Sequence, residues 1–255
     1  MSLYDYPRYY DLVYGSDWRA EFDFLTGVFD KHVCGEIKQL LEPACGTGRL
    51  IFRLQRAGFQ VDGLDLSSKA VNYCNKRLQR HGLQASAWVG DMTNFNVTSK
   101  YCAAFNTINS FRHLEQHHQS RDHLACMAKA IRKGGIYVLG LHLTPEIGEA
   151  SEEESWIARR GHLCVQTSMW LIHRNLKQRY ERFHMRYDIW TPTNHETLDD
   201  EFNFRTYTKT QFEEELLKEI PEFEITATYD FSYNLNQPLQ VDDHSEDVVY
   251  ILKRV

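Results

Sequence analysis

The sequence has no uninterrupted apolar run near the roughly 20 residues that a membrane-spanning helix needs. Residues 1–8 have neither the apolar core of a signal peptide nor the Arg- and Ser-rich character of a transit peptide. The six cysteines include no Cys-x-x-Cys pair, and most of them fall in apolar segments typical of reduced, buried thiols. We therefore expect a cytoplasmic protein with no membrane segment, no disulfide framework and no metal site.

The sequence also lacks an excess of positive charge. Its 29 Lys and Arg residues are outnumbered by 35 Asp and Glu residues, which gives a formal net charge of −6. Such a chain has no general positive field to attract a phosphate backbone, so polymeric nucleic acid is a disfavoured partner. The basic residues between Arg174 and Arg186 keep RNA or DNA open as an alternative.

The composition and the order of apolar segments predict an α/β fold. The 255 residues suffice for one domain with an insertion, and 42% hydrophobic and 25% charged residues are typical of a globular protein. From Ile37 to Leu141, apolar runs alternate with helix-period segments, the pattern of a parallel sheet with crossover helices. One helix is capped by Ser68 and ended by Gly82, and another carries Leu124, Met127 and Ile131 before Lys133-Gly134-Gly135. The expected strands are Ile37–Glu42, Gln60–Asp65, Ala85–Val89, Tyr101–Ile108 and Ile136–Leu141.

After Leu141 the pattern changes to strict alternation of apolar and polar residues. Leu163–Leu171 and Phe183–Ile189 both alternate in this way, which predicts a small antiparallel layer from about residue 155 to 208. The acidic run from Glu146 to Glu154 before it is expected to be a solvated loop.

The two ends of the chain add helices and strands to the core. Residues 17–32 have the spacing of an amphipathic helix, and Thr210 with Glu213 has the spacing of a capping box before the last helix. Two final strands are expected near Glu224–Phe231 and Asp247–Leu252. The predicted fold is a doubly wound, mostly parallel seven-stranded sheet with helices on both faces, plus a small antiparallel β insertion.

The segment Glu42–Gly48 lies between the first strand and a helix that begins near Arg49. Glycines there let the backbone turn tightly and approach a ligand closely, at the carboxyl end of a strand where open α/β sheets bind ligands. Small residues also occur in ordinary turns between a strand and a helix, so the segment alone leaves both interpretations open.

Two further acidic residues lie at the ends of the next strands. Asp65 follows Glu42 by 23 residues, where a carboxylate can accept hydrogen bonds from both hydroxyls of an adenosyl ribose. Asp91 closes the third strand and can receive the adenine amino group, while Leu66 or Met92 packs on the ring. Each acid alone is also typical of a cap or a turn. Together with the glycine turn, they predict an adenosyl ligand.

At these residues the chain resembles class I S-adenosylmethionine-dependent methyltransferases, whose signature Leu-Asp-x-Gly/Ala-Cys-Gly-Thr-Gly matches Leu41–Gly48. The resemblance extends to Tyr10-Asp11-x-x-Tyr14 and Gly134-Gly135. The signature's acid is displaced to Glu42, and Tyr101-Cys102 replaces the usual Phe-Asp at the start of strand four. The resemblance implies S-adenosylmethionine as cofactor and S-adenosylhomocysteine as product. The expected cofactor-binding residues are Tyr14, Glu42, Ala44, Gly46, Gly48, Asp65, Leu66, Asp91, Met92 and Asn109.

The resemblance also suggests where the methyl acceptor binds. The family often has a histidine-rich turn after strand four, here Asn109–Leu114, and the insertion is similar to one that roofs the substrate pocket in small-molecule N-methyltransferases, including sugar N,N-dimethyltransferases. We expect a small-molecule acceptor with a nitrogen or oxygen nucleophile, bound by Arg112, His113 and His142. A hydroxyl needs a proton acceptor, for which His113 and His142 are candidates, whereas an amine need only lose its proton. A solvated Arg112 and a structural His113 are the competing interpretations.

By the same resemblance, the chain divides into four parts. Residues 1–35 form a helical cap over the cofactor, 36–145 the cofactor-binding core, 146–208 the insertion that shapes the substrate site, and 209–255 the last helix and strands of the core sheet. The sequence leaves a homodimer open.

Three other functions compete with small-molecule methylation. A glycine turn followed by an acid also describes an NAD(P)-dependent oxidoreductase, although Ile51 replaces the third glycine of that motif. A non-catalytic S-adenosylmethionine-binding protein would keep the same pocket. A nucleic-acid methyltransferase is disfavoured because strand four lacks the Asn/Asp-Pro-Pro-aromatic motif of base-flipping amino methyltransferases.

Overall fold

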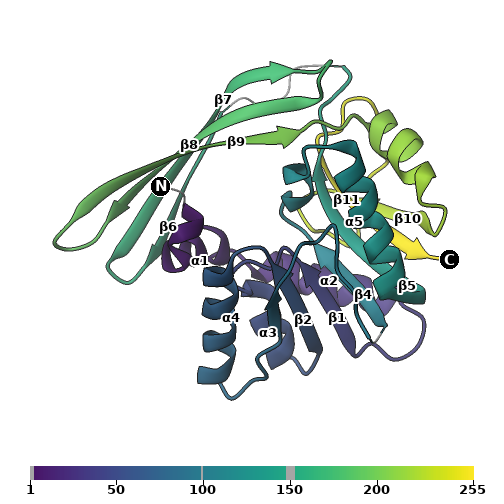
Figure 1. Cartoon of the computed structure of the whole chain (residues 1–255), viewed down its shortest axis with the longest axis horizontal. Helices are drawn as coiled ribbons and strands as arrows, with labels where there is room; N and C mark the ends of the chain where they lie inside the picture. The colour runs from purple at the N-terminus through teal and green to yellow at the C-terminus, as the bar shows by residue number, and fades with distance from the viewer. Residues whose placement is uncertain (1–2, 99, 148–152) are drawn as a thin grey trace.

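The core of the protein is a mixed, mostly parallel sheet of seven strands (Figure 1). The computed structural model describes residues 3–98, 100–147 and 153–255. The strand order is β3-β2-β1-β4-β5-β11-β10, and β11 runs antiparallel to both of its neighbours. The strands are β1 (Gln39–Pro43), β2 (Gln60–Asp65), β3 (Ala87–Val89), β4 (Tyr101–Asn106), β5 (Ile131–His142), β10 (Phe223–Tyr229) and β11 (Asp247–Arg254). The predicted fold class is confirmed.

Helices cover both faces of this sheet because its strands are apolar on both sides. In β11, Val248, Tyr250 and Leu252 pack with α5 and η3, whereas Val249 and Ile251 pack with α2, α3 and α4. This alternation is the two-residue period of a strand buried on both faces. The helices are η1 (Leu3–Asp5), α1 (Pro7–Gly15), α2 (Arg19–His32), α3 (Arg49–Arg56), α4 (Ser68–Arg80), η2 (Ser110–His113), α5 (His117–Ala130), η3 (Thr210–Leu216) and η4 (Leu217–Glu219).

The insertion is a separate antiparallel sheet of four strands, β6 (Glu153–Arg160), β7 (Leu163–Asn175), β8 (Tyr180–Trp190) and β9 (His195–Arg205). Figure 1 shows it as a curved sheet beside the core, with α1 lying against β6. The predicted insertion is confirmed, although β6 and β9 were not predicted as strands. Glu153 and Glu154 of the acidic run belong to β6, and its residues 148–152 lie outside the described residues.

Three local predictions are wrong. The cap of α4 is Ser67, whose hydroxyl accepts from the Ala70 amide at 3.2 Å, rather than Ser68. Ile131 begins β5 instead of ending α5, because residues 132–135 form an irregular stretch in which Gly134 has φ +77°. The local sequence of this stretch resembles a helix end, whereas sheet pairing decides the structure.

The predicted capping box of the last helix is also displaced. Thr208 and Gln211 exchange its two hydrogen bonds, at 3.2 and 3.3 Å. Glu213 instead accepts a hydrogen bond at 3.0 Å from the hydroxyl of Tyr250 in the core sheet. A tertiary contact of the Glu213 carboxylate therefore replaces the local capping contact that the sequence predicts.

A buried ion pair fixes the insertion to the core. The guanidinium of Arg112 in η2 pairs with Glu181 of β8, and its Nε donates to the Arg205 carbonyl at 2.9 Å. Arg174 of β7 donates to the other Glu181 oxygen at 2.7 Å. Arg112 and Glu181 are 2% and 3% exposed, so water cannot replace either partner.

We predict that Glu181→Gln lowers the free energy of unfolding by about 3 kcal/mol, because it leaves the charge of Arg112 buried and uncompensated. Urea denaturation monitored by circular dichroism measures this change. Glu224→Gln, the same substitution on the exposed side of β10, should change stability by no more than about 0.5 kcal/mol. Equal effects of the two substitutions would contradict the role of the pair.

Candidate active site

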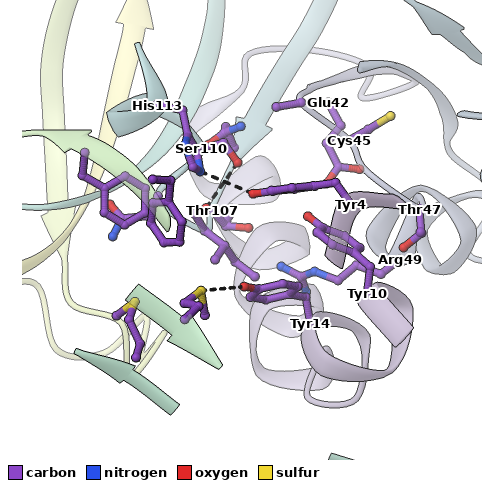
Figure 2. Close-up of a pocket in the computed structure, with 18 of the residues that line it drawn as sticks. Tyr4, Tyr10, Tyr14, Glu42, Cys45, Thr47, Arg49, Thr107, Ser110 and His113 are labelled. Atoms are coloured by element: carbon purple, nitrogen blue, oxygen red, sulfur yellow. Dashed lines mark hydrogen bonds between the residues drawn. The ribbon is translucent and has the colours of Figure 1, made fainter. Parts of the chain in front are cut away.

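A cavity of about 190 Å³ lies between the core sheet and the inner face of the four-stranded sheet (Figure 2). Its floor comes from the carboxyl end of β1, the turn that follows, and the segment after β4. Its roof comes from β6 to β9, and the N-terminal segment closes one side. The floor residues are Glu42, Ala44, Cys45, Thr47, Arg49 and Asn106–Ser110. The cavity therefore joins the predicted cofactor region to the insertion.

The glycine turn after β1 has a backbone that requires small residues. Gly46 and Gly48 have φ values of +52° and +68°. A Cβ on Gly48 would lie 2.2 Å from the sulfur of Cys74, and one on Gly46 would lie 3.0 Å from the ring of Tyr10. The Gly46 amide donates to Asp65 at 2.8 Å. The structure thus brings together the glycine turn and the acid at the end of β2, as predicted from their spacing.

Two buried oxygens in the cavity have no hydrogen-bond partner among the described residues. They are Oε2 of Glu42 and Oδ1 of Asn106, whose amide group donates to the Pro43 carbonyl at 2.9 Å. Burial raises the pKa of Glu42 to about 8, even though Arg49 lies nearby. The guanidinium of Arg49 is held by a bidentate pair with Glu21. The cavity therefore offers two acceptor oxygens to a ligand that carries hydrogen-bond donors. Asn106 was not predicted, since it was assigned to the interior of a strand.

Four predicted adenosine contacts lie at or just after strand ends, outside the cavity. Asp91 accepts hydrogen bonds at 2.8 Å from the amide and the hydroxyl of Thr93, as a turn residue does. Leu66 is 72% exposed, and Met92 packs against the core. Asp65 uses both carboxylate oxygens in the turn, because its second oxygen accepts from the Ser67 amide at 2.8 Å. Direct adenosine contacts of these residues stay predictions.

Tyrosines of the N-terminal segment form one wall of the cavity. Tyr14 lines it as predicted, and its hydroxyl lies 3.8 Å from the sulfur of Met185 in the roof. Tyr10 and Tyr4 line it as well, with the Tyr10 ring 4.8 Å from that of Tyr14 and 5.4 Å from that of Tyr4 (Figure 2). The four-residue spacing of Tyr10 and Tyr14 in α1 places both on one helix face, which is the signal that could have identified Tyr10.

Asp11, between these two tyrosines, is a buried ionic centre. Its carboxylate pairs with Arg77 of α4 and with Arg160 of β6, the latter at 2.8 Å. It also accepts a hydrogen bond at 3.1 Å from Thr47 in the glycine turn. Burial alone would raise the pKa of Asp11, yet the two arginines hold it below its ordinary value. Asp11 thereby fixes α1 to the core, the turn and the insertion.

His113 is the predicted acceptor-site residue that lines the cavity. Its ring packs 4.8 Å from that of Phe204 and 5.5 Å from that of Phe202, and its Nε2 lies 3.5 Å from the hydroxyl of Tyr4. Burial, assisted by the charge of Arg112, lowers the pKa of His113 to about 4. The imidazole is therefore neutral at pH 7 and is a poor proton acceptor.

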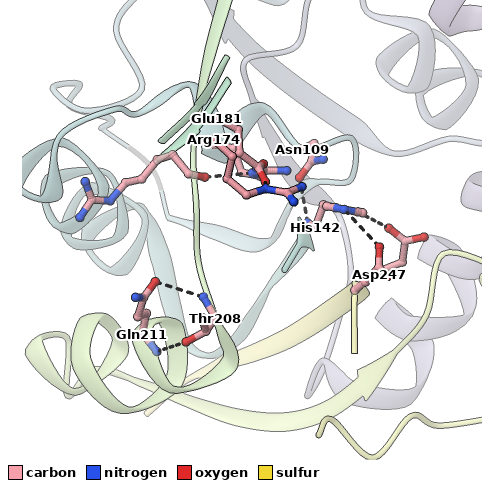
Figure 3. Close-up of polar contacts among 10 residues, drawn as sticks. Asn109, His142, Arg174, Glu181, Thr208, Gln211 and Asp247 are labelled. Atoms are coloured by element: carbon pink, nitrogen blue, oxygen red, sulfur yellow. Dashed lines mark hydrogen bonds and ion pairs between the residues drawn. The ribbon is translucent and has the colours of Figure 1, made fainter. Parts of the chain in front are cut away.

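The other two predicted acceptor-site residues do not line the cavity. The side chain of Arg112 turns into the buried pair with Glu181, so the expectation of a solvated or substrate-binding arginine is wrong. His142 at the end of β5 contacts Asp247 at 2.7 Å, and its amide donates at 2.8 Å to Asn109, which does line the cavity (Figure 3). Both side chains contact residues of other helices or strands, and the local sequence around each of them does not indicate these contacts.

Two kinds of feature are absent from residues 3–98, 100–147 and 153–255. No group of three or more His, Cys, Asp or Glu side chains there is arranged to hold a metal ion. No helix in these ranges is long and apolar enough to cross a membrane.

The fold is Rossmann-like, and its cavity lies at the carboxyl ends of β1 and β4. Residues 40–135 match the family model described as a methyltransferase domain. The matched range includes Leu41–Gly48, the segment at which the resemblance was found.

Curated relatives of the chain are methyltransferases that act on different acceptors. The dTDP-3-amino-3,4,6-trideoxy-alpha-D-glucopyranose N,N-dimethyltransferase of Streptomyces venezuelae is 28% identical over 145 residues, which are 56% of this chain and 59% of the relative. The glycine N-methyltransferase of Oryctolagus cuniculus is 29% identical over 134 residues, which are 46% of this chain and 43% of the relative. The chain thus spans less than two thirds of the length of either relative.

Solved structures resemble the whole chain, insertion included. An S-adenosylmethionine-dependent methyltransferase from Clostridium acetobutylicum has a TM-score of 0.78 at 15% identity, with 98% of each chain covered. A SAM-bound amino pentose methyltransferase from Micromonospora echinaspora has a TM-score of 0.75 at 17% identity, with 97% of each chain covered. At these identities the similarity shows that the fold is shared.

We predict that His113 titrates with a pKa of about 4 in histidine NMR spectra. Because the unfolded chain takes up this proton near pH 6.5, the folded protein should lose stability as the pH falls from 6.5 to 4. His113→Phe, which preserves an aromatic ring against Phe202 and Phe204, should remove this part of the pH dependence. A His113 pKa near 6.5 would show that the ring is solvated instead.

Proposed function

We propose that the protein is an S-adenosylmethionine-dependent methyltransferase with a small-molecule acceptor. The observation that carries this proposal is the pair of unpartnered oxygens, Glu42 Oε2 and Asn106 Oδ1, buried beside the glycine turn. Buried oxygens of this kind fit a cationic hydrogen-bond donor, such as the ammonium group of the methionine part of the cofactor. The match of residues 40–135 to a methyltransferase domain supports the same assignment.

Residues of the core would hold the rest of the cofactor. The glycine turn lets the backbone come close to the ligand at Gly46, and Asp65 at the end of β2 is the acceptor for the ribose hydroxyls. When bound, S-adenosylmethionine supplies an electrophilic methyl group on a positively charged sulfur. The ring faces of Tyr10 and Tyr14 stabilise positive charge in the cavity through cation–π interactions.

The residues around the acceptor favour a nitrogen nucleophile. The roof excludes water and confines the acceptor close to the floor, so that positioning supplies most of the rate enhancement. His113 is the histidine among the described lining residues, and its lowered pKa makes it a weak base at neutral pH. An amine needs no dedicated base once it is unprotonated, whereas a hydroxyl does. The relatives named as N-methyltransferases support the same choice.

Binding of S-adenosylmethionine at pH 7 should release a proton from Glu42. With a pKa of about 8, this carboxyl is mostly protonated before binding, and a ligand ammonium group stabilises its ionised form. Calorimetry in buffers of different ionisation enthalpy measures the release. Glu42→Gln should abolish the release and weaken binding by about tenfold or more. Glu224→Gln, on the exposed face of β10, should change neither quantity, and binding without proton release in the wild type would refute the assignment.

Gly46→Val and Asp65→Ala should abolish measurable binding of S-adenosylmethionine while the fold is kept. The valine side chain would collide with the Tyr10 ring and fill the approach to the turn. Gly82→Val is the matched control, because Gly82 also has a positive φ, +69°, but a Cβ there meets nothing within 4 Å. Unchanged affinity in both site variants, or tight NADH binding without S-adenosylmethionine binding, would overturn the proposed function.

A further inference from the structure

We propose that the methyl acceptor is an amine that is positively charged in water, carries an apolar body and bears no phosphate group. This inference rests on the proposed function, because it assigns the methyl acceptor to the half of the cavity that faces away from the glycine turn. It does not follow from the relatives, one of which is named for a dTDP-linked amino sugar.

The roof of the cavity is apolar, aromatic and rich in sulfur. Seven of the described lining residues come from β6 to β9, and all but Glu154 have uncharged side chains. The other six are Trp156, Met169, Met185, Tyr187, Phe202 and Phe204. Aromatic and thioether groups bind apolar groups, and aromatic ring faces also attract cations. Such a roof fits the carbon skeleton of an apolar amine.

Two carboxylates lie at or near the edge of this space. Arg49 is the cationic side chain among the described lining residues, and its pair with Glu21 compensates its charge. Glu154 of β6 lines the cavity at an exposed edge. Asp200 lies on the inner side of β9, two residues before Phe202, and is near enough to influence the pKa of His113. These carboxylates attract an ammonium group and repel a phosphate.

A phosphorylated acceptor would lack partners here. Proteins bind phosphate groups with arginine forks, lysines or backbone amides at helix N-termini. The described lining residues of the roof include no arginine or lysine. The nearby arginines Arg77 and Arg160 are held outside the cavity by Asp11. A diphosphate in the cavity would therefore be desolvated without compensation.

The acceptor must lose a proton before it reacts. The carboxylates at the edge favour the ammonium form, in which the acceptor arrives. Burial under the roof favours the neutral amine, so the ammonium group releases its proton to water on entry. The nitrogen lone pair then forms the new N–C bond while the C–S bond of the methyl donor breaks, with the bonding pair staying on sulfur. The methylated ammonium product releases its extra proton to water.

Calorimetry with two probes of matched size tests this assignment. The protein is first saturated with S-adenosylhomocysteine and then titrated with 2-phenylethylamine or with 3-phenylpropanoate. We expect the amine to bind at least about tenfold more tightly than the carboxylate, since the two differ by the sign of one charge in a poorly hydrated space. The dTDP-linked amino sugar should bind more weakly than the amine. Equal or tighter binding of either anion, or no binding of the amine, overturns the inference.

This design separates the inference from the proposed function. Failure of S-adenosylhomocysteine to bind would refute the proposed function, whereas normal binding of it with a preference for anions would refute the acceptor class alone. Glu154→Gln combined with Asp200→Asn should reduce the amine-to-carboxylate affinity ratio by about threefold or more. Asp199→Asn is the matched control, because Asp199 lies on the outer face of β9 and pairs with His184 and Arg186. An equal loss in the control would also refute the inference.

Discussion

The buried carboxylate of Asp11 holds together the parts of the molecule that surround the cavity. It lies on α1, between the two tyrosines that form the cavity wall, and it binds Arg77 of α4, Arg160 of β6 and Thr47 of the glycine turn. Without it, two arginines would face each other beside the turn, and α1 would lose its ion pair with the insertion. Asp11, which is 2% exposed, therefore holds the roof over the floor together with the Arg112–Glu181 pair.

Three buried carboxyl groups in this protein have different surroundings. This difference distinguishes two structural carboxylates from a candidate site residue. Asp11 and Glu181 each bind two arginines, which compensate their charge and connect separate elements. Glu42 has the same burial but no such partner, so its pKa rises to about 8. An uncompensated carboxyl is costly to the fold. Under the proposed function, a ligand in the cavity supplies the missing partner.

The sequence was sufficient to predict those features of the site that depend on strand ends and local spacing. The glycine turn and Asp65 are set by strand ends and backbone conformation, and both features appear in local spacing. The side chains of Arg112 and His142 depend instead on pairing with Glu181 and Asp247, which lie 69 and 105 residues away. No local pattern encodes such a pairing, and for this reason both residues were assigned to the acceptor site. The roof residues were within the predicted insertion, but their convergence required the strand register.

The proposed donor and acceptor sites come from different parts of this chain, and this division limits what its relatives reveal. The match to a methyltransferase domain covers residues 40–135, which provide the floor of the cavity. The roof, from β6 to β9, lies wholly outside that match. A glycine and a dTDP-linked sugar differ in size and charge, yet enzymes named for each align with this chain at similar identity. Under the proposed function, the floor therefore identifies the methyl donor, whereas the charges and rings that the insertion places above it select the acceptor.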